Sequence, residues 1–331
     1  MSLRAAIIGC GGFAHRHAKI LAALDDVALV GFCNRTLDKA IAFNAQYAGG
    51  KARVYTDYAP MFDELDLDLV YICLPPFAHG DEVELACQHG VHFLIEKPIA
   101  LTMDKAHAMA AAVAQSGVKS QAGFMFRHGE AVRQLKAHIE QTGHTNGFFN
   151  GRYFCNSLHS AWWRDKSKSG GQVVEQIIHI FDLARYLFGE PVHVYSMQEN
   201  LFHQDVVDYT VEDASATVAR FEGGGMAAIL ASNGAIPNRW DYDMRVMLPS
   251  LTVDFEDANH AVFHHTGQAW PTTTTLASEK DIYLAETLDL IAAIRDDRPT
   301  AVPIEQGVRS LAFVLAAARS AALNAPVGVE F

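Results

Sequence analysis

The feature that most constrains the fold of this chain is a glycine-rich segment, Ile-Ile-Gly-Cys-Gly-Gly-Phe-Ala, at residues 7–14. Apolar residues from Leu3 to Ile8 predict a strand before it, and helical spacing from His15 to Leu24 predicts a helix after it. Without these flanking elements the glycines would indicate only an ordinary turn. In a strand–turn–helix unit, the pattern G-x-G-x-x-A brings a pyrophosphate against a glycine backbone and the positive end of the helix. We therefore predict a dinucleotide site formed by Gly9, Gly11, Gly12, Phe13 and Ala14.

The rest of the first third alternates short apolar runs with stretches of helical spacing. Such alternation predicts βαβ units around a parallel sheet. The further strands are expected at Val27–Cys33, Leu69–Leu74, Val91–Ile95 and Ser120–Phe126, and the further helices at Leu37–Tyr47, Asp81–His89 and Met103–Ser116. We predict an α/β fold whose N-terminal domain, residues 1–122, is a Rossmann domain with a doubly wound parallel sheet.

The second half has a different pattern, in which several strands follow one another. The strands are expected at Gly147–Asn156, Val192–Phe202, Ala214–Phe221, Met226–Ser232, Tyr242–Leu248, Leu251–Phe255 and Ala261–His265. Helices are expected at Gln172–Phe188, Glu279–Arg295 and Ile304–Leu323, and a loop at Thr272–Thr275. The turn Glu222–Gly225 joins two of these strands into a hairpin. We predict an α+β domain over residues 123–331 with a mostly antiparallel, open sheet.

Charge and composition narrow the possible partners. The chain has 26 Lys and Arg against 38 Asp and Glu, a net charge of −12, which argues against nucleic acid and against an anionic membrane surface. We see no apolar run near the roughly 20 residues that span a bilayer, and no signal peptide. The five cysteines lie in mostly apolar surroundings, which favours reduced, buried thiols. We expect a cytoplasmic protein.

Two residues at the end of the second predicted strand bear on the choice of cofactor. An NAD site usually has Asp or Glu there to bind the ribose hydroxyls, whereas this chain has Asn34 and Arg35. Asn34 would not repel a 2′-phosphate, and Arg35 can pair with one. This favours NADP. The alternative is that Asn34 binds the hydroxyls of NAD and Arg35 is a solvated surface residue.

A lysine follows the fourth predicted strand, in the run Glu96-Lys97-Pro98. Doubly wound sheets bind ligands at the carboxyl ends of their strands, and an ammonium there can stabilise an alkoxide as hydride leaves its carbon. Considered alone, Lys97 is equally consistent with a solvated lysine in the turn that ends the strand.

A later helix is predicted to carry Glu175, His179 and Asp182 on one face, at positions i, i+4 and i+7. A histidine flanked by carboxylates suits a general acid or base. An isolated histidine on a half-buried helix is more often structural. No Cys-x-x-Cys or His-Glu-x-x-His pattern occurs, so we predict no metal site.

These segments together resemble the glucose–fructose oxidoreductase / inositol dehydrogenase / MocA family. The likeness covers essentially the whole chain and includes the glycine turn, Glu-Lys-Pro, and Gly170-Gly171 before the Glu175–Asp182 helix. It implies that Lys97 and His179 lie at the nicotinamide. It also implies a homodimer or homotetramer that associates through the open face of the second sheet, and it extends the cofactor-binding set to Pro75, His79, Glu96, Lys97, Arg127, Trp163 and Arg164.

The sequence also departs from the family pattern. The family often has Asp-x-Gly-x-His where this chain has Glu175-Gln-Ile-Ile-His179, so a substrate cannot be carried over by analogy. The cluster Trp162-Trp163-Arg164 suits a sugar pocket, or alternatively anchors a loop with two buried indoles.

We therefore predict an NAD(P)-dependent dehydrogenase or reductase that acts on CH–OH groups of a sugar, polyol or related hydroxy compound. Its catalytic residues would be Lys97, His179 and Glu175. The alternatives are an NAD-dependent glycoside-cleaving enzyme of the same fold and a non-catalytic cofactor-binding sensor. A sensor has no need of a proton-transfer pair, which argues against it.

Overall fold

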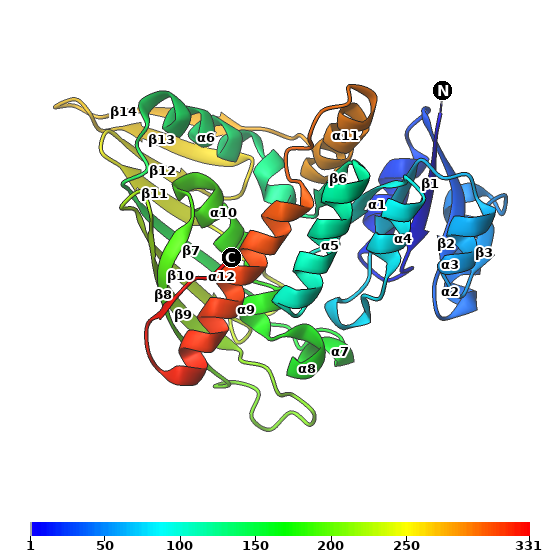
Figure 1. Cartoon of the computed structure of the whole chain (residues 1–331). Coiled ribbons are helices and arrows are strands. Elements are labelled where there is room, and N and C mark those ends of the chain that lie inside the picture. The colour runs from blue at the N-terminus through cyan, green and yellow to red at the C-terminus, as the bar shows by residue number, and fades with distance from the viewer. Residues whose placement is uncertain (1) are drawn as a thin grey trace. The chain divides into compact units, whose positions relative to one another are not determined.

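The computed structural model describes residues 2–331, which form two compact units (Figure 1). The first unit contains the residues up to Gly123 together with Tyr283–Val308, and the second contains Phe124–Ile282 and Arg309–Phe331. The segment Tyr283–Val308 therefore packs in the first unit, although the sequence analysis places it in the second domain.

The first unit is built on a sheet of six parallel strands. These are β1 (Leu3–Ile8), β2 (Val27–Cys33), β3 (Arg53–Tyr55), β4 (Leu69–Ile72), β5 (His92–Ile95) and β6 (Ser120–Ala122). Their order in the sheet is β3-β2-β1-β4-β5-β6, and every pair is parallel. The chain reverses its direction of winding between β1 and β4, the place at which such sheets bind dinucleotides. The predicted Rossmann sheet is confirmed.

Helices connect these strands and bury apolar residues against them. They are α1 (Ala14–Ala22), α2 (Leu37–Ala48), α3 (Ala59–Glu64), α4 (Glu82–Gln88), α5 (Met103–Ser116) and the 3₁₀ turn η1 (Pro76–Ala78). The core between α1, α2 and the sheet contains Leu21, Phe32 and Phe43. The strand β3 and the helix α3 were not predicted, because elements of three and six residues are too short to show a period.

The second unit is built on a nine-stranded sheet. Its strands are β7 (Phe148–Phe154), β8 (Pro191–Glu199), β9 (Ala214–Phe221), β10 (Met226–Ser232), β11 (Met244–Leu248), β12 (Leu251–Phe255), β13 (His260–His265), β14 (Thr272–Ala277) and β15 (Val327–Gly328). They lie in the order β14-β13-β12-β11-β7-β10-β9-β8-β15. Only β7 and β10 pair in parallel, so the prediction of a mostly antiparallel sheet is confirmed.

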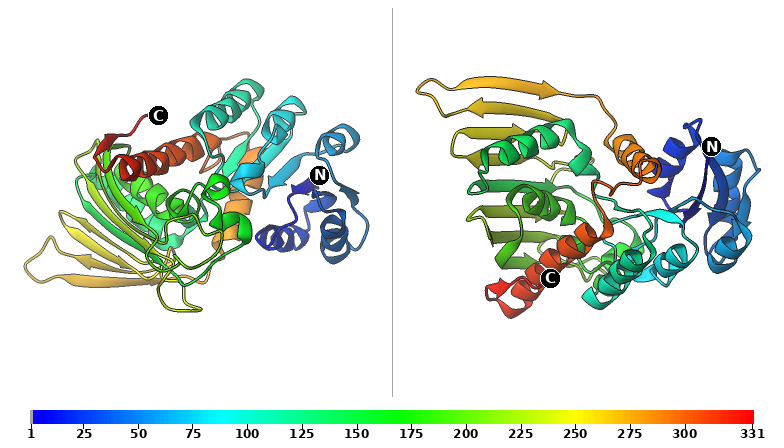
Figure 2. Two further views of the ribbon diagram at one scale, coloured as in Figure 1. Left: turned by 90° about the horizontal axis from the view of Figure 1, so that it is seen from below. Right: turned by 45° about the horizontal axis from the view of Figure 1, so that its top comes forward.

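Helices cover one face of this sheet (Figure 2). The helices of this unit are η2 (Met125–His128), α6 (Glu130–Thr142), α7 (Ala161–Arg164), α8 (Lys166–Ser169), α9 (Gln172–Glu175), α10 (Ile178–Phe188) and the part of α12 (Ile304–Leu323) that begins at Arg309. The remaining helix, α11 (Ile282–Arg295), packs in the first unit. Phe313 of α12 packs edge-on against Phe181 of α10 and Phe221 of β9. No helix within residues 2–331 has both the length and the apolar character needed to cross a bilayer.

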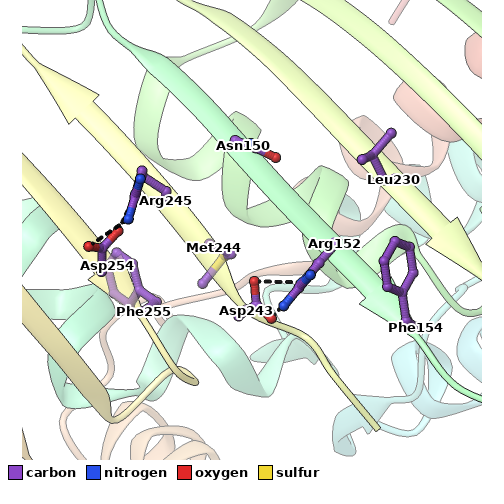
Figure 3. A pocket seen from close by; sticks show the side chains of 9 residues that line it. All are labelled: Asn150, Arg152, Phe154, Leu230, Asp243, Met244, Arg245, Asp254 and Phe255. Atoms are coloured by element: carbon purple, nitrogen blue, oxygen red, sulfur yellow. Dashed lines mark hydrogen bonds and ion pairs between the residues drawn. The ribbon is translucent and has the colours of Figure 1, made fainter. Parts of the chain in front are cut away.

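The other face of the sheet bears no helix, and strand side chains alternate between the two faces. A shallow hollow on this open face is crossed by two ion pairs, Arg152–Asp243 and Arg245–Asp254 (Figure 3). Leu230 lines the same hollow, and Val218 on the neighbouring strand β9 is also exposed.

Several sequence predictions are wrong in detail, among them the following. The expected loop at Thr272–Thr275 is part of the edge strand β14, because β-branched threonines suit an extended backbone even without an apolar period. The expected strand Ser120–Phe126 ends at Ala122. The expected helix Gln172–Phe188 is broken after Glu175, where the Ile177 amide donates to the Gln172 carbonyl five residues earlier.

Candidate active site

The glycine-rich turn after β1 has one glycine that the chain itself requires. Gly9 has φ +91°, and a Cβ there would lie 2.5 Å from the carbonyl oxygen of Cys73. At Gly11 and Gly12 the opposite holds, because a Cβ would meet no atom of the described chain within 4 Å. Packing within the protein does not explain those two glycines. A ligand that approaches the backbone does, as the pyrophosphate interpretation requires.

The N-terminus of α1 is open to an anion. Phe13 is its N-cap residue and makes no side-chain cap, and the first turn contains no acidic residue. The helix dipole and the first amide groups can therefore act on a phosphate. Together with the open space at Gly11 and Gly12, this shows that the turn fits the pyrophosphate of a dinucleotide.

Asn34, at the end of β2, holds the glycine turn in place. Its Oδ1 accepts a hydrogen bond from the Cys10 amide at 3.0 Å, and its Nδ2 donates to the Thr36 carbonyl at 2.9 Å. The side chain that the sequence analysis assigned to the cofactor thus also connects two segments of the backbone. Arg35 next to it is exposed.

Glu96 follows β5 and is buried in the first unit. Its Oε1 lies 2.7 Å from Nε2 of the fully buried His17, and its Oε2 accepts the Lys97 amide at 3.2 Å. A Cβ on Gly123 would come within 2.9 Å of the same Oε2. Glu96 is therefore held on three sides, and its carboxylate fixes the backbone from which the half-buried Lys97 extends.

His79 has a similar local role. Its Nδ1 lies 2.6 Å from Glu82 Oε1, and Glu82 Oε2 accepts the Gly80 amide at 2.7 Å. Burial alone would raise the pKa of Glu82, but the hydrogen bond with His79 lowers it below its ordinary value. The pair shapes the loop that begins at Pro75, which precedes η1.

The helix α11 contributes residues that the sequence analysis missed. Tyr283 packs against Phe13 and His17 with ring centroids 5.6 and 6.3 Å apart, and the guanidinium of Arg16 lies 4.7 Å from the centre of its ring. Glu286 on the same helix is fully buried. The only signal for these residues in the sequence was a polar residue, Glu286, on a largely apolar helix. That signal does not identify the segment of the chain against which the helix packs.

His179 lies in the first turn of α10, in the second unit. The side chain is 6% exposed and packs against two phenylalanines, with ring centroids 6.0 Å from Phe124 and 5.2 Å from Phe126. The prediction that Glu175 and Asp182 flank it on one continuous helix is wrong, because the helix is interrupted after Glu175. Each carboxylate has another partner.

Asp182 binds Arg127 through two hydrogen bonds. Arg127 Nε donates to Oδ2 at 2.7 Å and Nη2 donates to Oδ1 at 2.6 Å, and both side chains are buried. Ser310 of α12 donates to Oδ1 at 2.6 Å, and the Arg127 guanidinium also lies over the ring of Tyr186. Arg127, which the resemblance places at the cofactor, is thus part of a buried ion pair that joins η2, α10 and α12.

Glu175 is bound by a tryptophan. Trp163 Nε1 donates to Glu175 Oε2 at 2.6 Å, and the indole is buried against Tyr209 and Val211. Arg164 donates from Nε and Nη2 to the carbonyls of Leu158 and His159. Trp163 and Arg164 therefore anchor their loop, and Trp163 in addition orients the carboxylate that the sequence analysis singled out.

The fold and the glycine turn define a dinucleotide-binding protein of two domains. Residues 3–124 match a family described as an oxidoreductase family with an NAD-binding Rossmann fold, and residues 138–329 match the C-terminal alpha/beta domain of the same family. The chain belongs to this family, the Gfo/Idh/MocA oxidoreductases. The predicted resemblance is confirmed, and so is the prediction of a nicotinamide-dependent oxidoreductase.

Several characterised proteins are similar in sequence. A D-apiose dehydrogenase of Paraburkholderia graminis is 33% identical over 190 residues, which are 56% of this chain and 50% of that protein. A myo-inositol 2-dehydrogenase of Thermotoga maritima is 24% identical and covers 96% of each chain. An inositol 2-dehydrogenase of Rhizobium meliloti is 25% identical over 99% of this chain and 100% of its own.

Solved structures share the fold along the full length. A levoglucosan dehydrogenase in complex with NADH and levoglucosan superimposes with a TM-score of 0.91 at 20% identity and covers 100% of both chains. An oxidoreductase domain protein from Kribbella flavida gives 0.90, also at 20% identity and with 100% of both chains covered. At this identity the likeness establishes the architecture alone.

Proposed function

We propose that the protein is an NAD(P)-dependent dehydrogenase or reductase that transfers hydride between a nicotinamide and a CH–OH group of a sugar, polyol or related compound. The observation that carries the proposal is the glycine turn, where space is open at Gly11 and Gly12 and the end of α1 is uncapped. The relatives that act on apiose and inositol support the substrate class.

The bound dinucleotide supplies the hydride acceptor. In the oxidising direction, His179 takes the proton of the hydroxyl as the C–H bond breaks, so that the carbon becomes a carbonyl and one proton stays on the imidazole. Lys97 donates a hydrogen bond to the same oxygen and stabilises its developing negative charge. Glu175, held by Trp163, binds a neighbouring hydroxyl. In the reducing direction the carbonyl carbon receives the hydride from the nicotinamide, and His179 returns its proton to the oxygen.

Arg35 makes NADP the favoured cofactor in this proposal. It is exposed at the end of β2, where the family fold carries the adenosine ribose, and no acidic residue stands at Asn34 or Thr36 beside it. A guanidinium in that place pairs with a 2′-phosphate.

We also propose that the open face of the nine-stranded sheet is buried in a homodimer or homotetramer. The face exposes the apolar side chain of Leu230 beside its ion pairs (Figure 3). Val218, on the neighbouring strand β9, is exposed as well. A monomeric mass in light scattering at micromolar concentration would contradict this.

The proposed reaction is tested by following the nicotinamide absorbance band with a panel of sugars and polyols and with each free cofactor. Reduction of free NAD or NADP by one of these compounds is the expected result. Conversion of a glycoside without net change in the free cofactor would favour a glycoside-cleaving enzyme. Cofactor binding without either reaction would favour a sensor.

A further inference from the structure

A row of aromatic rings in the second unit connects the two residues that the proposed function assigns to the substrate. It begins at Phe126, which contacts His179, and continues through Tyr242, Tyr153 and Trp240 with successive centroid distances of 5.4, 5.9 and 6.1 Å. From Trp240 it passes to His159 at 5.6 Å and from there to Trp163 at 4.2 Å. Trp163 in turn holds Glu175.

The exposure of these rings does not follow the pattern of a core cluster. Phe126 and Trp163, at the two ends, are 7% and 2% exposed, whereas Trp240 in the middle is 47% exposed. Tyr153 and Tyr242 beside Trp240 are partly exposed as well. A row that is anchored at both ends and open to solvent between them forms a surface on which a ligand can lie.

The backbone around the row is shaped at some energetic cost. His159 has φ +53°, in the left-handed region that a residue with a Cβ adopts rarely, and its imidazole packs against the Trp163 ring at a tilt of 40°. Its Nε2 lies 3.2 Å from Gln176 Nε2, next to Glu175. Strained residues gather at ligand sites, where the surrounding structure holds them in place. The row thus has polar groups along its edge at the end nearest Glu175.

We propose that this aromatic row, Phe126, Tyr242, Tyr153, Trp240, His159 and Trp163, binds the second ring of a glycoside, so that the substrate is a glycoside rather than a free monosaccharide or cyclitol. The proposal rests on the proposed function, because His179 and Glu175 are taken to bind the sugar that is oxidised. One sugar ring covers about one aromatic ring, and the row is several rings long. Trp240 stands at 88° to Tyr153 and at 66° to His159, so its exposed face receives the C–H face of the second ring. The polar edge receives the hydroxyls of that ring.

The test compares two tryptophans that differ in position. Trp240→Ala removes the exposed centre of the row, and Trp270→Ala removes an indole that is 86% exposed and outside it. The substrates are free glucose, galactose, mannose and xylose, their methyl glycosides, their phenyl glycosides, and cellobiose. The methyl glycosides block the anomeric hydroxyl without adding a ring.

The parent protein should give its highest kcat/KM with phenyl glycosides or cellobiose. Trp240→Ala should reduce that value about five- to tenfold, as expected for a lost stacking contact, and change the value for methyl glycosides less than twofold. Trp240→Phe should restore part of the loss, and Trp270→Ala should change neither value. Equal losses for all substrates, or a parent enzyme that prefers free sugars, would overturn the proposal.

A binding measurement separates this proposal from the proposed function. Tryptophan fluorescence is titrated with phenyl glycosides and cellobiose, with and without cofactor. If no compound reduces the cofactor but a phenyl glycoside or cellobiose binds, and Trp240→Ala weakens that binding, the aromatic row is supported and the dehydrogenase proposal fails. If neither binds, or if Trp240→Ala changes the oligomeric mass, the row serves packing and the inference is wrong.

Discussion

The two units assemble their candidate residues in different ways. In the first unit they lie at the carboxyl ends of adjacent parallel strands, as Asn34 does after β2 and Glu96 and Lys97 do after β5. In the second unit His179 packs against Phe126 of η2, and Glu175 is held by Trp163 of α7. Rings from the chain before β11 and from β7 pack in turn against Phe126. A parallel sheet brings functional groups together through its topology, whereas the mixed sheet depends on particular long-range contacts.

The buried ion pair of Arg127 and Asp182 is the strongest case of such a contact. Arg127→Met leaves the Asp182 carboxylate buried without its bidentate partner. The free energy of unfolding should fall by about 3–5 kcal/mol, which urea denaturation can measure. Cofactor affinity at low temperature should remain within a few-fold if the guanidinium serves Asp182 alone.

A double-mutant cycle completes this test. Arg127→Met leaves the negative charge of Asp182 without its partner, and Asp182→Asn removes that charge. The double variant should therefore be more stable than the sum of the two single losses predicts. Additive losses would show that the pair is not coupled. A large rise in the cofactor dissociation constant would instead return Arg127 to the cofactor site that the family resemblance implies.

In the first unit, substitution of Lys97 is expected to lower the turnover number rather than the free energy of unfolding. Lys97→Met keeps the length of the side chain and removes its charge, while the glycine turn that binds the pyrophosphate is unchanged. Turnover should fall on the order of a hundredfold, about 2.7 kcal/mol, with the cofactor dissociation constant within a few-fold. His179→Asn should also reduce turnover and flatten the limb of the pH–rate profile that belongs to the base.

Lys51→Met, at an exposed lysine on the amino-terminal side of β3 and away from the carboxyl ends of the strands, is the matched control and should leave both constants unchanged. A near-parental rate for Lys97→Met would make the Glu-Lys-Pro turn structural. The proposed chemistry would then rest on His179 alone.

The same contrast explains what the sequence could predict. A glycine turn between a strand and a helix, or a lysine after a buried strand, is visible over a few residues, and β1, β2 and α5 were predicted with their observed bounds. The partners of Asp182 and Glu175 are 55 and 12 residues away in the sequence, and periodicity does not reveal them. The break after Glu175 went unseen because the residues on both sides have helical spacing.

Arg35 tests whether strand-end residues in the first unit also select the cofactor. Arg35→Ala should weaken NADP binding by roughly 1.5–3 kcal/mol, as a lost charge-assisted contact does, and leave NAD binding nearly unchanged. Titration calorimetry with both cofactors measures the difference, and Arg35→Lys should recover part of it. Equal losses for NAD and NADP would remove the phosphate role.

The smallest expected effect concerns Glu286, the one place where the first unit also depends on a distant segment. The side chain is fully buried on α11, and neither carboxylate oxygen has a hydrogen-bond partner among residues 2–331. Burial, and then the charges of Glu96 and Asp289, raise the pKa of Glu286 well above its ordinary value of 4.5. The folded protein therefore keeps a proton that the unfolded chain releases above that value.

A group whose pKa is raised by folding stabilises the folded state below its unfolded pKa and loses that contribution as the pH rises toward its folded pKa. For Glu286 this loss is at most about 1.4 kcal/mol per pH unit. Glu286→Gln cannot ionise, so its stability relative to the parent should increase between pH 5 and pH 6 by about 1 kcal/mol in urea denaturation. Glu222→Gln, at an exposed hairpin turn, should show no such change. If the two variants have the same pH dependence, Glu286 is not protonated in the folded protein, and its carboxylate must then be stabilised by a charge or hydrogen bond that water or a bound ligand supplies.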